Sequence, residues 1–331
     1  MEARFYSSAE GKVRCELCYQ GCTIAPGETG HCRVRKNEGG VLNTLIYGLA
    51  SAVHADPIEK KPLYHFHPGT DALSFGTYGC NFHCSFCQNW DISQKDCDDR
   101  DGRGRRVSVD DVVRMAKGSN CDGVAWTYNE PTIWHEFTYD ASVAAKEAGL
   151  YTCYVTNGYI QPEPLRELAP VLDAMNIDVK AFRDGFYQKF SGAHLKPVLR
   201  TAELAVELGI HVELTYLIVP GENDDPDELR DFAKWAVGSL GADVPLHFSR
   251  FHGDYKMSSH GGTPMETMEL AYRTAKEEGA NFVYLGNVRT DKGNTFCPEC
   301  GEVLIDRSGF SVTSIRVVCE KCGYRLPVAG P

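Results

Sequence analysis

The feature of the sequence that most constrains its fold is an alternation of short apolar runs and helix-length amphipathic segments between residues 71 and 286. Successive apolar runs are separated by enough chain for a crossover helix, which parallel pairing of strands requires. The predicted strands span residues 72–78, 123–127, 151–156, 174–179, 211–219, 245–251 and 282–285. The predicted helices span residues 109–117, 137–149, 164–169, 198–208, 226–240 and 264–279.

This alternation predicts an α/β protein with a parallel sheet whose outer face is covered by helices. A complete eightfold βα barrel takes about 250 residues, and the alternating segment is shorter than that. We therefore expect a partial, open βα barrel of about six strands, at most seven. Ligands of parallel βα folds bind at the carboxyl ends of the strands, so the residues that follow each strand are candidates for a site.

Cysteines are the second informative feature of the sequence. The 331 residues include 14 cysteines, and all but Cys97, Cys121 and Cys153 fall into three groups. The beginning of the chain has no apolar run typical of a signal peptide, and no stretch is long and apolar enough for a transmembrane helix. We therefore expect a cytoplasmic protein, in which clustered cysteines indicate metal sites rather than disulfides. The three isolated cysteines are interpreted as bystanders.

The cysteine groups divide the chain into three predicted parts. Residues 1–71 are expected to be an irregular, cysteine-rich metal-binding segment, with a strand or hairpin at 41–50. Residues 72–289 are expected to form the partial barrel, and residues 290–331 a small third module. The formal net charge of -11 argues against broad binding to nucleic acid, which needs basic side chains to neutralise phosphates.

The central group consists of Cys80, Cys84 and Cys87, directly after the first predicted strand. A 4Fe–4S cluster is normally held by four thiolates, so three cysteines leave one iron open to the amino and carboxylate groups of a cofactor. The alternative is a tetrahedral zinc site completed by His83 or by a distant residue.

This motif resembles the signature of the radical S-adenosylmethionine (SAM) superfamily, in which an aromatic residue, here Phe86, precedes the last cysteine. Residues 79–89 are similar to the activating enzymes of glycyl-radical enzymes, such as pyruvate formate-lyase activases. They are more similar still to the radical enzymes of the AmmeMemoRadiSam system, which share the cysteine-rich beginning and the block at 57–63. The resemblance covers most of residues 13–290 and implies a 4Fe–4S cluster and SAM as cofactors.

The resemblance also implies contacts to SAM. Tyr128, Asn129, Glu130 and Pro131 resemble the Gly-Gly-Glu-Pro element that binds the amino group of the methionine moiety, with Glu130 retained and the two glycines replaced. The alternative is a polar turn before a helix at Trp134.

Thr156 and Asn157 follow the third predicted strand, and Asp178 and Lys180 follow the fourth. They match elements that line the methionine and ribose of SAM in the activases. A sulfonium amino acid offers an amine to Asp178 and a carboxylate to Lys180.

Two further elements match the family in the same way. Residues 217–221 resemble the segment that flanks the adenine, although their apolar side chains also suit the core. His252 follows the sixth predicted strand and resembles a histidine that contacts the cofactor. The alternative for His252 is a hydrogen-bonded surface residue.

The N-terminal group contains Cys15, Cys18, Cys22 and Cys32, with His31 as an alternative ligand. Four thiolates suit either a zinc site or an auxiliary iron–sulfur cluster. The spacing differs from the ferredoxin run, and the sequence alone favours zinc.

The C-terminal group contains two CxxC pairs, Cys297 with Cys300 and Cys319 with Cys322. This arrangement predicts zinc in a zinc-ribbon or rubredoxin-like module. Such a module is too small for a large core, so the metal would supply its folding energy, ~10–16 kcal/mol for structural zinc. The module is either a folded cap or a docking site for a partner.

Together these patterns predict a radical SAM enzyme that reductively cleaves SAM to a 5′-deoxyadenosyl radical, with a reductant such as ferredoxin or flavodoxin. The substrate is a glycyl-radical enzyme, or another protein, RNA or small molecule. The rival hypothesis is a non-catalytic zinc scaffold that binds a partner. An open iron at the central cysteines distinguishes the two, because a closed zinc site needs a fourth protein ligand.

Overall fold

The structure is a computed structural model that describes residues 1–94 and 104–330; Cys97 lies outside these ranges. Its largest element is a sheet of eight strands, of which all but the first to occur in the chain were predicted. They are β7 (Ala52–Pro57), β8 (Asp71–Gly76), β10 (Gly123–Trp126), β11 (Tyr151–Thr156), β12 (Ala174–Asp178), β13 (His211–Ile218), β14 (Leu246–Arg250) and β15 (Val283–Gly286).

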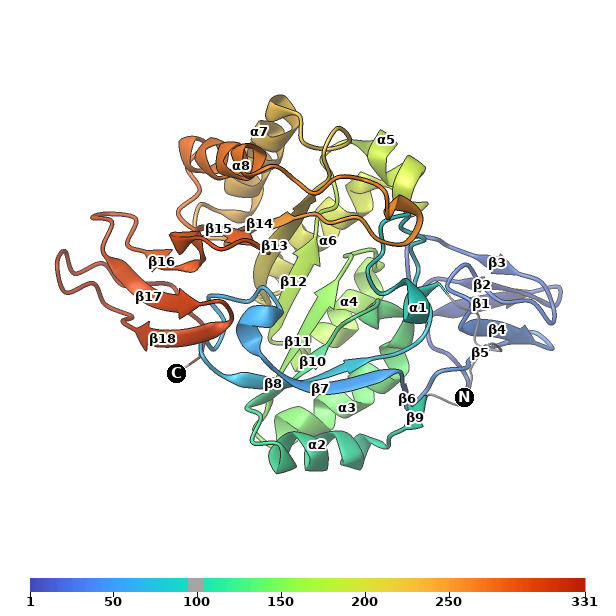
Figure 1. The fold of residues 1–331 in the computed structure, drawn as a ribbon. Coiled ribbons are helices and arrows are strands. Elements are labelled where there is room, and N and C mark those ends of the chain that lie inside the picture. The colour runs from blue at the N-terminus through green and yellow to red at the C-terminus, as the bar shows by residue number, and fades with distance from the viewer. Residues whose placement is uncertain (95–103, 331) are drawn as a thin grey trace.

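The strand order is β15-β14-β13-β12-β11-β10-β8-β7 (Figure 1). All neighbouring strands from β8 to β15 are parallel, and β7 pairs antiparallel with β8 at the edge. The α/β class and the parallel sheet are therefore confirmed. The strand bounds differ from the predicted ones by one or two residues, which is the usual uncertainty of strand ends.

The predicted helices are also present between these strands. They are α2 (Val109–Gly118), α3 (His135–Glu147), α4 (Pro162–Leu168), α6 (Leu195–Glu207), α7 (Pro226–Trp235) and α8 (Met265–Glu277). Two of them begin at side chains that cap the free backbone N–H groups. Ser108 forms a capping box with Asp111 at the start of α2, and Asp225 accepts from two backbone N–H groups at the start of α7. No helix within residues 1–94 and 104–330 is long and apolar enough to cross a bilayer.

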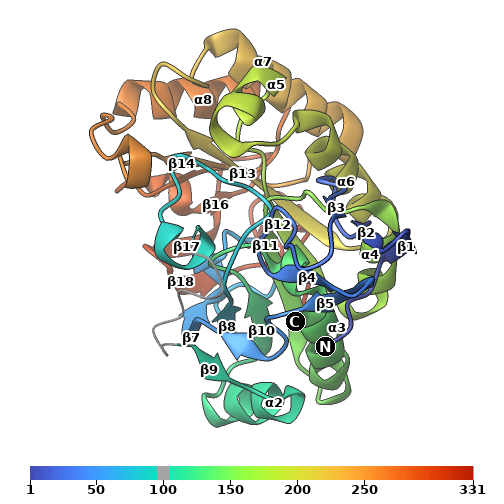
Figure 2. The ribbon, with the colours of Figure 1, turned by 90° about the vertical axis from the view of Figure 1, so that its right-hand side faces the viewer.

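The N-terminal segment is not irregular, and that prediction was wrong, whereas the strand or hairpin expected at 41–50 is present. Strands β1 (Tyr6–Ala9), β2 (Lys12–Cys15) and β3 (Thr23–Ile24) form a small sheet, and β4 (Arg35–Glu38) pairs with β5 (Val41–Thr44) as a hairpin. Figure 2 shows these strands beside α3 and α4. Most of these strands lack a regular alternation of apolar and polar residues. They are stabilised by backbone pairing and by packing against the helices, which local sequence propensity does not reveal.

The loop between β7 and β8 also contacts β13, in the other half of the sheet. Glu213 on β13 is fully buried and accepts hydrogen bonds from the backbone N–H groups of Tyr64 (2.9 Å) and His65 (2.7 Å). The rings of His211 and His247 also contact its carboxylate, at 3.0 Å and 2.7 Å. Although burial alone would raise the pKa of Glu213, these two histidines hold it well below its ordinary value.

The C-terminal residues form a three-stranded antiparallel sheet that packs against β15. Its strands are β16 (Thr295–Phe296), β17 (Val303–Ser308) and β18 (Ser311–Ile315). Leu304 and Ile305 share one apolar cluster with Tyr64 and Tyr284, so this module and the main sheet have a common core.

Gly79 is the turn between β8 and the central cysteine loop, and its backbone has φ = +84°. A Cβ atom here would lie 2.5 Å from the carbonyl oxygen of Cys32 and 2.7 Å from Val34 Cγ1. Only glycine therefore lets the N-terminal segment approach the central loop this closely.

Gly79→Ala is expected to lower the unfolding free energy by about 1–3 kcal/mol, because the methyl group meets a backbone carbonyl and the left-handed φ becomes strained. The matched control is Gly118→Ala in α2, where a Cβ atom has no neighbour within 4 Å. Chemical denaturation of both variants is the measurement. Equal midpoints for the two variants would contradict this account of Gly79.

Candidate functional site

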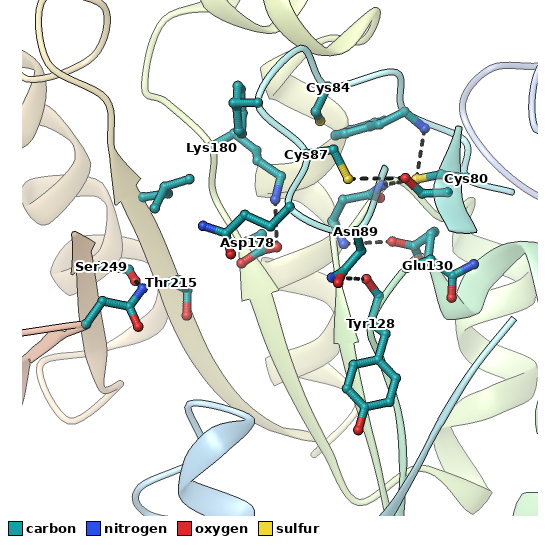
Figure 3. A pocket seen from close by; sticks show the side chains of 18 residues that line it. Cys80, Cys84, Cys87, Asn89, Tyr128, Glu130, Asp178, Lys180, Thr215 and Ser249 are labelled. Atoms are coloured by element: carbon teal, nitrogen blue, oxygen red, sulfur yellow. Dashed lines mark hydrogen bonds and ion pairs between the residues drawn. The ribbon is translucent and has the colours of Figure 1, made fainter. Parts of the chain in front are cut away.

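A cavity of about 230 Å³ lies at the carboxyl ends of the parallel strands, where the fold predicts a site. The central cysteines Cys80, Cys84 and Cys87 line one side of it, on the loop that follows β8 (Figure 3). Asp178 and Lys180, from the end of β12, line the cavity next to the cysteine loop. The structure thus brings together residues that are almost a hundred positions apart in the chain.

The central thiols make hydrogen bonds, both within the cysteine loop and to a distant part of the chain. The sulfur of Cys80 accepts from the backbone N–H of Phe82 at 3.3 Å, and the thiol of Cys84 donates to Ser191 Oγ at 3.4 Å. Burial raises the pKa of Cys84 to about 11 and that of Cys80 well above its ordinary value. A metal that binds here must displace protons from these thiols.

The geometry favours a three-thiolate site over a zinc site completed by His83. The Nε2 atom of His83 lies 3.2 Å from the carbonyl oxygen of His31, and its ring stacks on the His31 ring at 4.0 Å, so the imidazole is engaged away from the cavity. Within the described parts of the chain, no His, Cys, Asp or Glu completes a compact ligand group with these three thiols. The donor set therefore fits a cluster with one iron not bound by the protein.

Glu130 joins the ends of β10 and β11 beneath the cavity. It is 1 % exposed and accepts from the backbone N–H of Thr132 (2.9 Å), the hydroxyl of Thr156 (2.7 Å) and the backbone N–H of Asn157 (2.8 Å). Burial raises the pKa of Glu130. Thr156 itself does not line the cavity, so the structure gives it the role of orienting Glu130.

Two asparagines connect this layer to the cysteine loop. Asn129 accepts from the backbone N–H of Thr77 at 3.1 Å and donates to the carbonyl oxygen of Gly79 at 2.7 Å. Asn157 donates to Asn81 Oδ1 at 2.7 Å, next to Cys80. Both asparagines also line the cavity, as the sequence predicts.

Lys180 and Asp178 form an ion pair of 2.6 Å at the cavity wall. Burial opposes the charged form of Lys180, but the neighbouring Asp178 carboxylate and Cys84 raise its pKa above the ordinary value. The pair therefore offers a fixed cation and a fixed anion to a zwitterionic ligand.

Tyr128 occupies a position where the resembling families carry glycine, and its backbone explains that preference. Its φ is +70°, a left-handed conformation that costs a bulky residue about 1–2 kcal/mol. Its hydroxyl donates to Asp56 at 2.6 Å, and its carbonyl oxygen accepts from Asn89 at 2.6 Å. These contacts fix the position of Tyr128, and its backbone groups remain at the cavity.

Asp56, on β7, also binds two lysines. Its oxygens accept from Lys60 and Lys61, both at 2.7 Å, and Lys61 is only 2 % exposed. Although burial alone would raise the pKa of Asp56, the hydrogen bonds from the lysines and Tyr128 hold it far below its ordinary value. The block at 57–63 is therefore linked through Asp56 to Tyr128, which lines the cavity.

The sequence analysis missed several polar side chains that line the cavity: Gln88, Asn89, Ser93, Thr215, Ser249 and Asn287. Asn287 directly follows β15, so the rule of searching after every strand identifies it. Thr215 and Ser249 lie within strands, and no sequence pattern marks them. His252 does not line the cavity; its Nδ1 atom lies 3.3 Å from Gln88 Nε2, so the structure places it beside the cavity rim.

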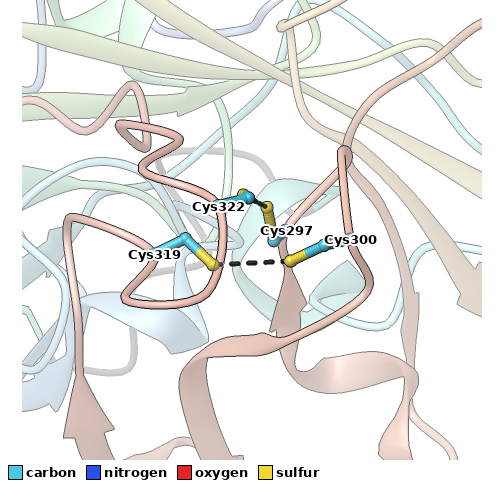
Figure 4. A group of neighbouring side chains, drawn as sticks. All are labelled: Cys297, Cys300, Cys319 and Cys322. Atoms are coloured by element: carbon cyan, nitrogen blue, oxygen red, sulfur yellow. Dashed lines mark hydrogen bonds between the residues drawn. The ribbon is translucent and has the colours of Figure 1, made fainter.

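The four C-terminal cysteines form a compact ligand group (Figure 4). Their sulfur atoms all lie within 4.8 Å of one another, and the pairs Cys297–Cys322 and Cys300–Cys319 are each 3.5 Å apart. Tetrahedral zinc with Zn–S bonds of about 2.3 Å places its sulfurs about 3.8 Å apart, so the group fits zinc.

The N-terminal cysteines line a separate, mostly apolar cavity. Cys15, Cys18, Cys22 and Cys32 surround it together with His31, so the structure brings the predicted group together. Cys121 and Cys153 are buried and belong to neither cavity nor to a cysteine group, as expected of bystanders.

Comparison with known proteins agrees with this geometry. The model of the radical SAM superfamily matches residues 75–235, which include the central cysteines and the Asp178–Lys180 pair. The chain therefore belongs to the radical SAM superfamily, whose members use a 4Fe–4S cluster and SAM.

The chain is similar in sequence to other proteins and in fold to a solved structure. The uncharacterized protein MJ0808 of Methanocaldococcus jannaschii is 46% identical over 334 residues, 99% of each chain. Pyruvate formate-lyase 1-activating enzyme of Escherichia coli is 30% identical over 168 residues, covering 48% of this chain and 65% of that enzyme. A crystal structure of a radical SAM methyltransferase from Sphaerobacter thermophilus shares the fold, with a TM-score of 0.52, 15% identity, and coverage of 72% and 71% of the two chains.

Asp56→Asn is expected to destabilise the protein by about 3–5 kcal/mol at pH 7, because it leaves the buried Lys61 without its counter-ion. The pKa of Asp56 is lowered by folding, so its contribution is complete above its ordinary pKa near 4 and is lost as the pH falls below it.

The measurement is the unfolding midpoint of wild type and variant from pH 7 down to pH 3. The difference between them is expected to shrink toward acid. The exposed Asp231→Asn serves as the control and is expected to change stability by less than about 0.5 kcal/mol. A constant difference at all pH values would show that Asp56 does not act through its charge.

Proposed function

We propose that this chain catalyses radical SAM chemistry, with Cys80, Cys84 and Cys87 as the ligands of a 4Fe–4S cluster. The observation that carries the proposal is the convergence of three thiols on a cavity that the Asp178–Lys180 ion pair also lines. A structural zinc site does not need an ion pair beside its thiolates. A cofactor that carries an amine, a carboxylate and a sulfonium can bind to such a pair.

When bound, the reduced cluster supplies one electron to the sulfonium of SAM, which releases methionine and a 5′-deoxyadenosyl radical. The residues of this chain bind and orient the cofactor. Lys180 would bind the carboxylate of the methionine moiety, and Asp178 and the backbone at Tyr128 and Asn129 would bind its amine and the ribose. Glu130 holds the strand ends in register, and the apolar segment at 217–221 flanks the adenine.

The finer proposal concerns the hydrogen that the radical removes. Alignment with pyruvate formate-lyase 1-activating enzyme over 168 residues favours a glycine of a partner protein as the substrate. A further protein, RNA or a small molecule is the alternative substrate. A one-electron donor such as ferredoxin or flavodoxin is the proposed reductant.

We propose zinc as the metal of the four C-terminal cysteines, in a ribbon-like module that begins near residue 290. The compact sulfur spacing supports zinc, and the common core with β15 supports a role as a folded cap on the edge of the sheet. We also propose that the parallel sheet and its helices form a partial, open βα barrel that spans residues 72–289.

Protein prepared without oxygen, reconstituted with iron and sulfide and reduced, is expected to convert SAM to 5′-deoxyadenosine and methionine. Cys84→Ala is expected to reduce the product to the background of a protein-free mixture, because two thiolates do not hold the cluster. Cys121→Ala, a buried cysteine outside the cavity, is the matched control and is expected to retain activity. Product formation that is equal in both variants, or absent from wild type with zinc at the central site, would leave the zinc scaffold as the better account.

Cys319→Ser is expected to remove about one zinc per chain and to lower the unfolding midpoint, because the module depends on its metal. Elemental analysis and denaturation test both effects, with Cys121→Ser as the control. Unchanged zinc content in Cys319→Ser would rule out the C-terminal quartet as the zinc site.

A further inference from the structure

The N-terminal and C-terminal cysteine quartets differ in the spacing of their sulfur atoms. The C-terminal sulfurs lie within 4.8 Å of one another, whereas no three ligand atoms of the N-terminal group, Cys15, Cys18, Cys22 and Cys32, satisfy the same limit. These four sulfurs instead surround the cavity that Leu17 and Ile24 also line.

The spacing of the central triad provides an internal standard. The sulfurs of Cys80, Cys84 and Cys87, which lie in the segment that the family model matches, likewise do not all lie within 4.8 Å of one another. Zinc with Zn–S bonds of about 2.3 Å needs sulfurs about 3.8 Å apart. An iron–sulfur cluster carries its thiolates on different irons around a larger body, so its sulfurs stand farther apart. The N-terminal quartet therefore resembles the cluster site and differs from the zinc site.

A buried cation lies beside this cavity. Arg35 is 1 % exposed and lines the cavity, with Nη1 3.9 Å from the sulfur of Cys15. Its guanidinium also pairs with the buried Glu136. The Arg35 Nε atom has no hydrogen-bond partner among the described residues. Glu136 compensates the charge of Arg35, and Nη1 of Arg35 is directed toward a sulfur of the quartet, as it would be toward a thiolate ligand.

This second site lies against the loop of the central site. The ring of His31, next to Cys32, stacks on the ring of His83, next to Cys84, with 4.0 Å between the ring centres. A second close approach joins the same two segments, because Gly79 admits the carbonyl oxygen of Cys32 only by lacking a Cβ atom. Cys32 and Cys84 belong to one apolar core.

We propose that Cys15, Cys18, Cys22 and Cys32 hold a second iron–sulfur cluster that donates electrons to the central site. The sequence alone favours zinc, and the sulfur spacing reverses that preference. In each transfer the second cluster loses one electron and the central cluster gains it. A one-electron donor of the ferredoxin or flavodoxin class then reduces the second cluster again. The electron-transfer role rests on the proposed function, whereas the identity of the metal does not.

The test is the metal content of the full chain after anaerobic reconstitution with iron and sulfide. A variant with Cys80, Cys84 and Cys87 all changed to Ala is expected to retain about two to four irons with matching sulfide, and an iron–sulfur absorption band. The further change Cys32→Ser is expected to remove that iron, while Cys121→Ser in the same background retains it. Zinc without iron in the triple variant would overturn the proposal.

The same measurements separate this proposal from the proposed function. If the central site holds no cluster, wild type and the triple variant contain equal iron, and the second cluster still stands. The electron-transfer role is tested by stopped-flow reduction with reduced flavodoxin. Wild type is expected to show a fast phase of central-cluster reduction, and Cys32→Ser is expected to lose it. An unchanged fast phase would overturn the electron-transfer role.

Discussion

The structure depends on a set of buried hydrogen bonds that join the carboxyl ends of consecutive strands. Asn129 binds the backbone of Thr77 and Gly79 at the turn after β8, and Glu130 binds the end of β11 through Thr156 and Asn157. Glu130, Thr156 and Asn157 are buried, so losing one partner leaves a polar atom unpaired at a cost of about 1–3 kcal/mol. The network therefore fixes the cysteine loop relative to the sheet, and the cavity exists because the strand ends cannot move independently.

Much of this arrangement could be predicted from the sequence. The alternating pattern identifies every parallel strand, because apolar runs and crossover segments follow from burial and chain length. The residues after the strands, such as Glu130, Asp178 and Lys180, belong to the site for the same reason. The edge strand β7 was not predicted, because it is held by pairing with β8 rather than by its own pattern. Thr215 and Ser249 likewise line the cavity from within strands. At such positions the sequence alone does not distinguish a residue that lines a cavity from one that packs in the core.

The three cysteine groups show what sequence spacing does and does not determine. Spacing identifies which cysteines act together, and the structure gathers each group as expected. The distance between sulfurs, which distinguishes one metal ion from a larger cluster, depends on how the surrounding segments pack. The close approach of Cys32 to Gly79 and the stacked rings of His31 and His83 are such packing effects, and they connect two sites that are separate in the sequence.

The central claim is that the three thiols leave one iron open to the amine and carboxylate of SAM. The most direct measurement is electron–nuclear double resonance of the reduced protein with SAM isotopically labelled at its amino nitrogen. The account predicts a hyperfine coupling between the labelled nitrogen and the cluster, which a variant lacking Cys84 does not show. A cluster spectrum that is unchanged by SAM, with no coupling to the label, would contradict it.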